Sequence, residues 1–103
     1  MQNPFVEPIT CLGQTVGRKP VKRFGMYQSD RLFHTYIIGQ TGTGKSTLLR
    51  NMTKQDINAK RGFCLIDPHG DLAEAVAGQL GDRGIYWDVA DPQSPFGYNP
   101  LCG

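Results

Sequence analysis

The feature that most constrains this chain is a glycine-rich stretch at residues 39–46, Gly-Gln-Thr-Gly-Thr-Gly-Lys-Ser. It satisfies the pattern G-x-x-x-x-G-K-[ST], in which the backbone N–H groups of a tight loop surround a polyphosphate. Glycine permits the turns that aim those N–H groups inward. In such a loop the Lys45 ammonium reaches the β- and γ-phosphates, and the Ser46 hydroxyl binds Mg²⁺. The stretch therefore predicts a site for nucleotide phosphates and Mg²⁺.

The flanking sequence has the strand–loop–helix order that such a loop requires. Residues 32–38 are rich in β-branched and aromatic side chains and carry no formal charge, as expected of a buried parallel strand. Residues 45–60 contain neither proline nor glycine, and apolar side chains recur near one helical face at Leu48, Leu49, Met52 and Ile57. The positive N-terminal end of this helix would face the phosphates. A flexible Gly/Thr linker is the alternative, and this order argues against it.

A second predicted strand, residues 63–67, ends in a carboxylate. Ligands gather at the carboxyl ends of parallel strands, so we expect Asp67 beside the phosphate loop, holding Mg²⁺ or its water shell. The alternative is a structural turn in which Pro68 fixes φ and Asp71 caps the next helix. His69 has the same two interpretations, as a turn residue or as a contact to phosphate, metal or attacking water.

The remaining elements complete an α/β pattern. Lys60, Arg61 and Gly62 predict the basic last turn and the C-cap of the first helix. A second helix follows Asp71, with an apolar face at Leu72, Val76 and Leu80. Residues 85–89 predict a third strand, and Cys64 is expected to be buried in the second. The predicted fold is α/β, a partial parallel sheet of about three strands with flanking helices.

Length and composition set outer bounds on the architecture. The chain has 103 residues, which is at most one small domain, and its three cysteines are dispersed, without the paired spacing of a zinc site or a disulfide framework. It has no apolar run near the roughly 20 residues that cross a bilayer. No basic and apolar signal-peptide pattern opens the sequence. We expect a soluble, cytoplasmic protein without a membrane segment.

Charge is unevenly distributed along the chain. Residues 1–62 hold ten basic and three acidic side chains, a net +7, whereas residues 63–103 hold one basic and six acidic, a net −5. Four of the basic residues lie within residues 17–23, at Arg18, Lys19, Lys22 and Arg23. This run is either a solvated loop or a contact to a nucleic-acid backbone, and the adjacent Phe24 and Tyr27 either pack or stack on a base.

Four segments together resemble a known family. They occur in the order Asp30-Arg31-x-x-His34, the loop of residues 39–47, Leu65-Ile66-Asp67-Pro68-His69-Gly70-Asp71-Leu72, and Tyr98-Asn99-Pro100-Leu101. This set is similar to the start of the ATPase domain in the HerA–FtsK superfamily, and most similar to the HerA-like helicase and type IV secretion DNA-transfer (coupling protein) branch. The resemblance covers about residues 21–101. On this basis we expect residues 1–20 to be an irregular leader and residues 21–103 to be the N-terminal portion of a P-loop ATPase domain.

The resemblance implies a RecA-like P-loop core that binds ATP and Mg²⁺ and commonly assembles as a homo-hexamer through which DNA moves. The resemblance implies that Asp67 lies near the nucleotide, as a second metal ligand beside Ser46. It also implies catalytic roles for Asp67 and for Lys45, whose charge would stabilise the transition state. The residues expected to hold the phosphates and metal are Gly39, Thr41, Gly42, Thr43, Gly44, Lys45, Ser46 and Thr47.

The sequence departs from the family at the residues for hydrolysis. The family has a later strand that ends in an acidic pair and an arginine supplied by a neighbouring subunit. After residue 72 this chain has no apolar run ending in Asp-Glu, and its only arginine there is Arg83. The sequence therefore predicts ATP binding and leaves two functions open, part of a DNA-translocating ATPase or a non-hydrolysing nucleotide-binding module that assists assembly or regulation. A GTPase, suggested by the D-x-x-G spacing of Asp67 and Gly70, is disfavoured because no N-K-x-D motif is present.

Overall fold

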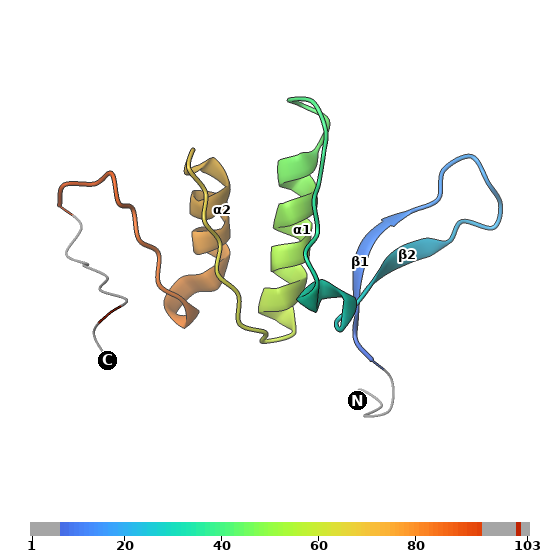
Figure 1. The fold of residues 1–103 in the computed structure, drawn as a ribbon, viewed down its shortest axis with the longest axis horizontal. Helices are drawn as coiled ribbons and strands as arrows, with labels where there is room; N and C mark the ends of the chain where they lie inside the picture. Colours follow the sequence, from blue (N-terminus) through green and yellow to red (C-terminus); the bar gives the residue numbers. More distant parts are fainter. Residues whose placement is uncertain (1–6, 94–100, 102–103) are drawn as a thin grey trace. The chain divides into compact units, whose positions relative to one another are not determined.

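The computed structural model describes residues 7–93 and residue 101, which fall into two compact units, residues 1–63 and 64–103. The first unit contains β1 (Ile9–Gln14), β2 (Arg23–Tyr27), the 3-10 turn η1 (Asp30–Leu32) and α1 (Lys45–Asn58), and the second contains α2 (Asp71–Leu80) and the 3-10 turn η2 (Gly81–Arg83) (Figure 1). Among the described residues, the buried apolar side chains are Ile57 in the first unit and Val76 in the second. None of the described helices is both long and apolar enough to span a membrane.

The described part of the first unit begins with a hairpin, whose first strand lies within the segment that we expected to be an irregular leader. β1 and β2 are antiparallel, with Ile9 opposite Tyr27 and Gln14 opposite Arg23, and the register shifts between Cys11 and Gly13. Such a shift is the mark of a β-bulge. The hairpin continues across residue 20, where the sequence suggested a boundary between a leader and the ATPase domain.

Helix α1 contacts the hairpin through a glutamine that pairs with the backbone of β1. The Gln55 side chain donates from Nε2 to the Cys11 carbonyl at 2.9 Å and accepts from the Cys11 N–H at 2.8 Å. These are the two hydrogen bonds that a neighbouring strand residue would make to β1. Gln55 therefore holds α1 against the strand at the position of the bulge.

The next residue of α1, Asp56, is the centre of a buried ion-pair cluster. Its side chain receives two bonds from the Arg31 guanidinium, at 2.6 and 2.8 Å, and a third from Arg61 Nε at 2.9 Å. Arg31 also donates to the Thr10 hydroxyl at 3.0 Å, and Thr10 is 1 % exposed. Asp56 itself is 4 % exposed. The hydrogen bonds from Arg31 lower the pKa of Asp56, and the bond from Arg61 adds to this effect. Burial opposes it, but the net shift is downward, so the carboxyl stays ionised.

The end of α1 differs from the sequence prediction. The helix ends at Asn58, and the left-handed residue after it is Lys60, with φ of 57°, in place of the predicted cap Gly62. The Arg61 N–H donates to the Asp56 carbonyl at 2.9 Å and the Lys60 N–H to the Ile57 carbonyl at 3.1 Å. This is the Schellman pattern. In most Schellman motifs an apolar contact joins these two positions, and here the Arg61–Asp56 ion pair takes its place. This ion pair stabilises the turn at Lys60, so the helix ends before Gly62.

The predicted parallel sheet is not observed. Residues 33–38, 63–67 and 85–89 belong to no strand, and the only described sheet is the β1–β2 hairpin. Most of their apolar side chains are exposed, including Tyr36 at 88 % and Ile66 at 86 %, while Ile37 and Leu65 are half-buried. Cys64 is exposed where we predicted it to be buried. A parallel strand is stabilised by neighbours on both sides, and no described segment supplies those neighbours here.

The predicted apolar face of the second helix is confirmed. α2 covers Asp71–Leu80, Val76 is 2 % exposed, and Leu72 and Leu80 are half-buried on the same side of the helix. Spacing by four residues places these three side chains one above another. The sequence therefore gave the type and the buried face of this helix correctly.

The ion-pair cluster leads to a prediction about stability and pH. Asp56→Asn should lower the free energy of unfolding by about 3 kcal/mol, because two arginines would lose their buried carboxylate. The folded pKa of Asp56 is below its unfolded value, so its contribution is complete above about pH 4 and is lost as pH falls through the folded pKa. Urea unfolding of both proteins at neutral and acid pH tests this. Equal stability at neutral pH, or an unchanged gap at acid pH, would contradict it.

The left-handed turn leads to a second prediction. Lys60→Gly should raise the free energy of unfolding by about 1 kcal/mol, because a glycine at φ of 57° removes the clash of the side chain with its own backbone. The matched control is Ala59→Gly, at φ of −84°, where glycine brings only added flexibility to the unfolded chain. Thermal unfolding should show a higher midpoint for the first variant and a lower one for the second. A lower midpoint for Lys60→Gly would show that the backbone is not left-handed there.

Candidate nucleotide-binding loop

The glycine-rich stretch forms a compact loop that leads directly into α1. Gly42 and Gly44 have φ of 84° and 100°, in the left-handed region that favours glycine, and the helix starts at Lys45. Gly39 is restricted differently, since a Cβ there would stand 2.6 Å from Thr43 Oγ1. Glycine is therefore favoured at positions 42 and 44 by the backbone conformation and at position 39 by the lack of space for a Cβ.

Two side chains close this loop. The Thr43 hydroxyl and N–H both donate to the Gln40 carbonyl, at 2.6 and 3.2 Å. Lys45 folds back in the same direction, and its ammonium donates to the Gly39 carbonyl and, at 3.0 Å, to the Gln40 carbonyl. The lysine therefore lies across the mouth of the loop, with its charge held by main-chain oxygens that phosphate oxygens could replace.

The first turn of α1 presents positive electrostatic potential. The Leu48 N–H bonds to the Gly44 carbonyl at 2.9 Å, while no backbone carbonyl in the described part of the chain accepts from the N–H groups of Lys45, Ser46 or Thr47. No acidic residue lies in this turn. Free N–H groups at a helix start, with the helix dipole behind them, favour a bound anion.

The predicted phosphate residues and Ser46 lie in one continuous segment of the first unit, whereas Asp67 lies in the second unit. Residues 39–47 form one continuous loop and first turn at the start of α1 (Figure 1). Thr41, Ser46 and Thr47 are exposed. The Ser46 hydroxyl is an oxygen ligand of the kind that Mg²⁺ accepts. No group of three or more His, Cys, Asp or Glu side chains suited to a metal occurs among residues 7–93 or at residue 101. A metal held here would therefore depend on phosphate and water oxygens as well as on Ser46.

Asp67 lies in the second unit and accepts hydrogen bonds from the start of α2. Oδ1 accepts the His69 N–H at 3.1 Å, and Oδ2 accepts the N–H groups of Leu72 and Ala73 at 2.9 and 3.1 Å. The Ala73 N–H above all, with those of His69, Gly70 and Leu72, lowers the pKa of Asp67. Its carboxylate performs the helix capping that we had assigned to Asp71.

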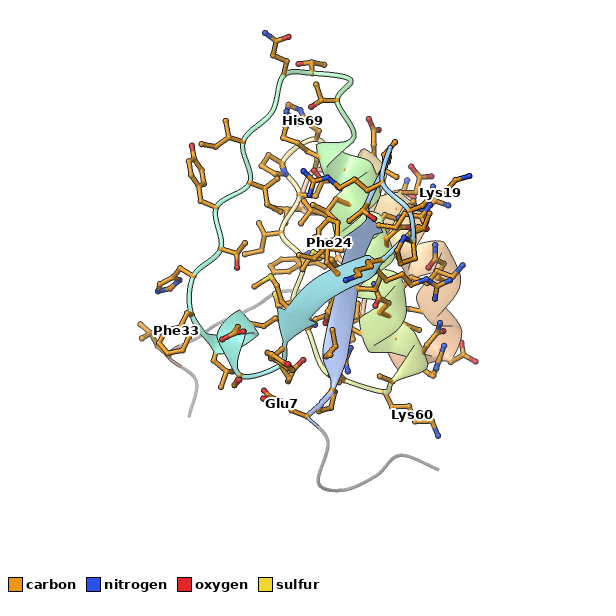
Figure 2. All side chains as sticks on the ribbon, turned by 90° about the vertical axis from the view of Figure 1, so that its right-hand side faces the viewer. Glu7, Lys19, Phe24, Phe33, Lys60 and His69 are labelled. Carbon is orange, nitrogen blue, oxygen red and sulfur yellow. The ribbon has the colours of Figure 1, made fainter. Side chains whose placement is uncertain are left out.

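The assignment of the cap to Asp71 was therefore wrong. The residue at the N-cap position is Gly70, in the left-handed region with φ of 88°, and Asp71 is the first residue of the helix. Because the chain turns sharply between Asp67 and Gly70, the earlier carboxylate reaches the free N–H groups of the first turn. The His69 side chain is exposed (Figure 2). The last motif segment, residues 98–100, lies outside the described residues.

Sequence reasoning missed the residues that hold α1 in place. Arg31 belongs to the segment Asp30-Arg31-x-x-His34, but the sequence predicted no role for it. It predicted none for Gln55 or Asp56 either. One signal was available, because Asp56 is the only acidic residue between positions 39 and 62 and precedes Arg61 by five residues. A lone acid in a basic segment indicates a paired and buried carboxylate.

The loop geometry defines a phosphate-binding loop at a helix N-terminus, the class of site found in P-loop proteins. Residues 30–90, more than half of the chain, match the family model described as "Helicase HerA, central domain", and the chain belongs to this family. Neither the curated proteins nor the solved structures gave a match. Membership indicates a nucleotide-binding ATPase of the helicase family, whose ATPases generally use ATP and Mg²⁺, bind DNA and often form hexamers.

The hydrogen bonds of Asp67 lead to a third prediction. Asp67→Ala should lower hydrogen-exchange protection across α2 by on the order of tenfold, because Leu72 and Ala73 lose their acceptor. Asp71→Ala is the control, since Asp71 makes no capping bond and should change protection much less. Protection due to Asp67 should be complete above about pH 4 and lost as pH falls through its lowered folded pKa. Equal effects of the two variants would refute the capping role.

Proposed function

We propose that this chain is the ATP-binding portion of a DNA-translocating ATPase of the HerA-like helicase or conjugative DNA-transfer type. The observation that carries the proposal is the loop of residues 39–47, in which left-handed glycines, Lys45 and free helix N–H groups occur in one continuous segment at the start of α1. The family match supplies the ATPase class. The type IV secretion branch, the homo-hexamer and the N-terminal position of residues 21–103 within the ATPase domain are parts of the proposal.

In this proposal Lys45 exchanges partners when nucleotide binds. Its ammonium leaves the carbonyls of Gly39 and Gln40 and bonds to β- and γ-phosphate oxygens, which carry full negative charge and therefore attract it more strongly than carbonyl dipoles do. The N–H groups of Ser46 and Thr47 donate to the same phosphates. Residues 39–44 supply further N–H groups, and the helix dipole adds to the attraction.

Mg²⁺ would bind through the Ser46 hydroxyl and the phosphate oxygens, with Asp67 as a second oxygen donor. Asp67 and the loop lie in different units, so their approach is part of the proposal. The metal would neutralise charge on the phosphates and orient them. The proposal also includes the RecA-like sheet, with residues 32–38, 63–67 and 85–89 as its parallel strands. The exposed apolar side chains of these segments support it, since burial against neighbouring strands would remove them from water.

The test is Mg²⁺-dependent binding of ATP to the purified chain. Lys45→Ala should weaken binding on the order of a hundredfold, because a charge-assisted contact to phosphate is lost. The matched control is Lys54→Ala, an exposed lysine later in the same helix, which should leave the affinity unchanged. Isothermal titration with ATP, with and without Mg²⁺, measures both. Equal affinity of wild type and Lys45→Ala, or no binding by wild type, would exclude the proposed site.

A second candidate is a nucleotide-binding module that does not hydrolyse ATP and serves assembly or regulation of a larger ring. The observation that favours it is the lack of an Asp-Glu pair after residue 72. Phosphate release by the same preparations separates the two. Turnover that disappears in Lys45→Ala excludes the non-hydrolysing module, and Mg²⁺-dependent binding without turnover supports it.

A further inference from the structure

The β1–β2 hairpin ends in a strongly basic loop that the nucleotide site does not use. The Thr15 N–H bonds to the Lys22 carbonyl at 2.8 Å and the Lys22 N–H to Thr15 Oγ1 at 3.0 Å, closing a loop of residues 16–21. Figure 1 shows this loop projecting from the strands away from α1. It precedes residues 30–90, so the family match does not account for it.

Positive charge is concentrated at this end of the hairpin. Arg18, Lys19, Lys22 and Arg23 are exposed, and none of their side chains makes an ion pair or hydrogen bond within the described ranges 7–93 and 101. Residues 8–29 contain no acidic side chain. Glu7, the acid nearest in sequence to β1, accepts the Ser29 N–H at the opposite end of the hairpin. The four charges therefore have no compensating partner at the loop.

An aromatic ring lies beside these charges. Phe24 stands opposite Gly13 in the register, and a Cβ on Gly13 would be 3.1 Å from Phe24 Cζ, so the ring lies over the glycine backbone. The ring is nonetheless 55 % exposed. Figure 2 shows Lys19 and Phe24 on the hairpin. Packing on the glycine fixes the inner side of the ring and leaves the remainder open to stack on an unpaired base.

We propose that this hairpin loop, residues 15–24, is a nucleic-acid contact that binds the phosphodiester backbone through its four basic side chains, with Phe24 as a stacking surface. Two adjacent pairs of cations on a short loop match a polymer that carries closely spaced phosphates. The choice of DNA as that polymer depends on the proposed function. The contact is separate from the ATP site and reads no base sequence. DNA binding through it should therefore be insensitive to sequence and strongly sensitive to salt.

The experiment compares two variants with the same change in net charge. In the first, Arg18, Lys19, Lys22 and Arg23 are all replaced by Gln. In the control, the four exposed basic residues outside the loop and the nucleotide site are replaced by Gln, and these are Arg50, Lys54, Lys60 and Arg83. Fluorescence anisotropy with labelled single-stranded and duplex DNA of mixed sequence is measured over a series of KCl concentrations. Circular dichroism checks that each variant keeps its fold, and ATP titration is run on all three proteins.

The loop variant should lose about tenfold or more in DNA affinity at low salt, and the slope of log K against log salt should fall by about three to four, close to 0.9 for each lost phosphate contact. The charge-matched control should keep most of the DNA affinity and most of the salt slope. ATP affinity should be the same in all three proteins. In wild type background, Phe24→Ala should weaken single-stranded DNA more than duplex DNA, because only unpaired bases stack on the ring.

Three results would overturn the proposal. They are the absence of DNA binding by wild type, equal losses in the loop variant and the control, and loop-dependent binding to phosphatidylglycerol vesicles in place of DNA, which would make the loop a membrane contact. The two proposals fail separately. Loss of loop-dependent DNA binding with Lys45-dependent ATP binding intact refutes only the hairpin contact, and the reverse pattern refutes only the nucleotide site.

Discussion

The first unit depends on one buried carboxylate. Asp56 joins Arg31 before the glycine loop to Arg61 after α1, and Arg31 extends the cluster to Thr10 of β1. With Ile57 as the only buried apolar side chain described in this unit, apolar burial contributes little to holding the hairpin on the helix. Directional bonds take that role, and Gln55 adds two more to the same strand. A carboxylate that accepts three directed bonds gives a defined orientation that a small apolar contact would not give.

That orientation bears on the nucleotide loop. α1 has 14 residues and is therefore about 20 Å long, with the Asp56 cluster in its last turn and Lys45 at its start. Two bonds from Arg31 to Asp56 and two between Gln55 and Cys11 hold this end of the helix. They fix the helix axis, so the free N–H groups at the other end point in a constant direction. The loop can then stay exposed to solvent, because its position is set from the opposite end of the helix. The C-terminal end of α1 is thus held in place, while its N-terminal end is accessible to a ligand.

What the sequence predicted correctly was local. The loop at residues 39–46 and the positions of the two helices follow from patterns within a few residues, and the structure has them at those places. The predicted apolar face of α1 is only partly correct, since Ile57 is buried but Leu49 is exposed. The docking contacts join residues far apart in sequence, 44 residues for Cys11 and Gln55 and 25 for Arg31 and Asp56, and no periodic pattern marks them. The predicted parallel strands are not formed in this structure for a related reason, since apolar β-branched runs form strands only when neighbours exist to pair with them.

Asp67 shows how a motif residue can serve structure and chemistry together. A carboxylate offers about four lone-pair directions, and three of them already accept the N–H groups of His69, Leu72 and Ala73. The Gly70 N–H also interacts with this carboxylate, so bidentate binding of Mg²⁺ would break the cap of α2. The low pKa that the backbone N–H groups impose keeps the carboxylate ionised, and the same bonds fix its direction. The turn from Asp67 to Gly70 therefore fixes the direction of a carboxylate whose proposed role is that of an oxygen donor to Mg²⁺.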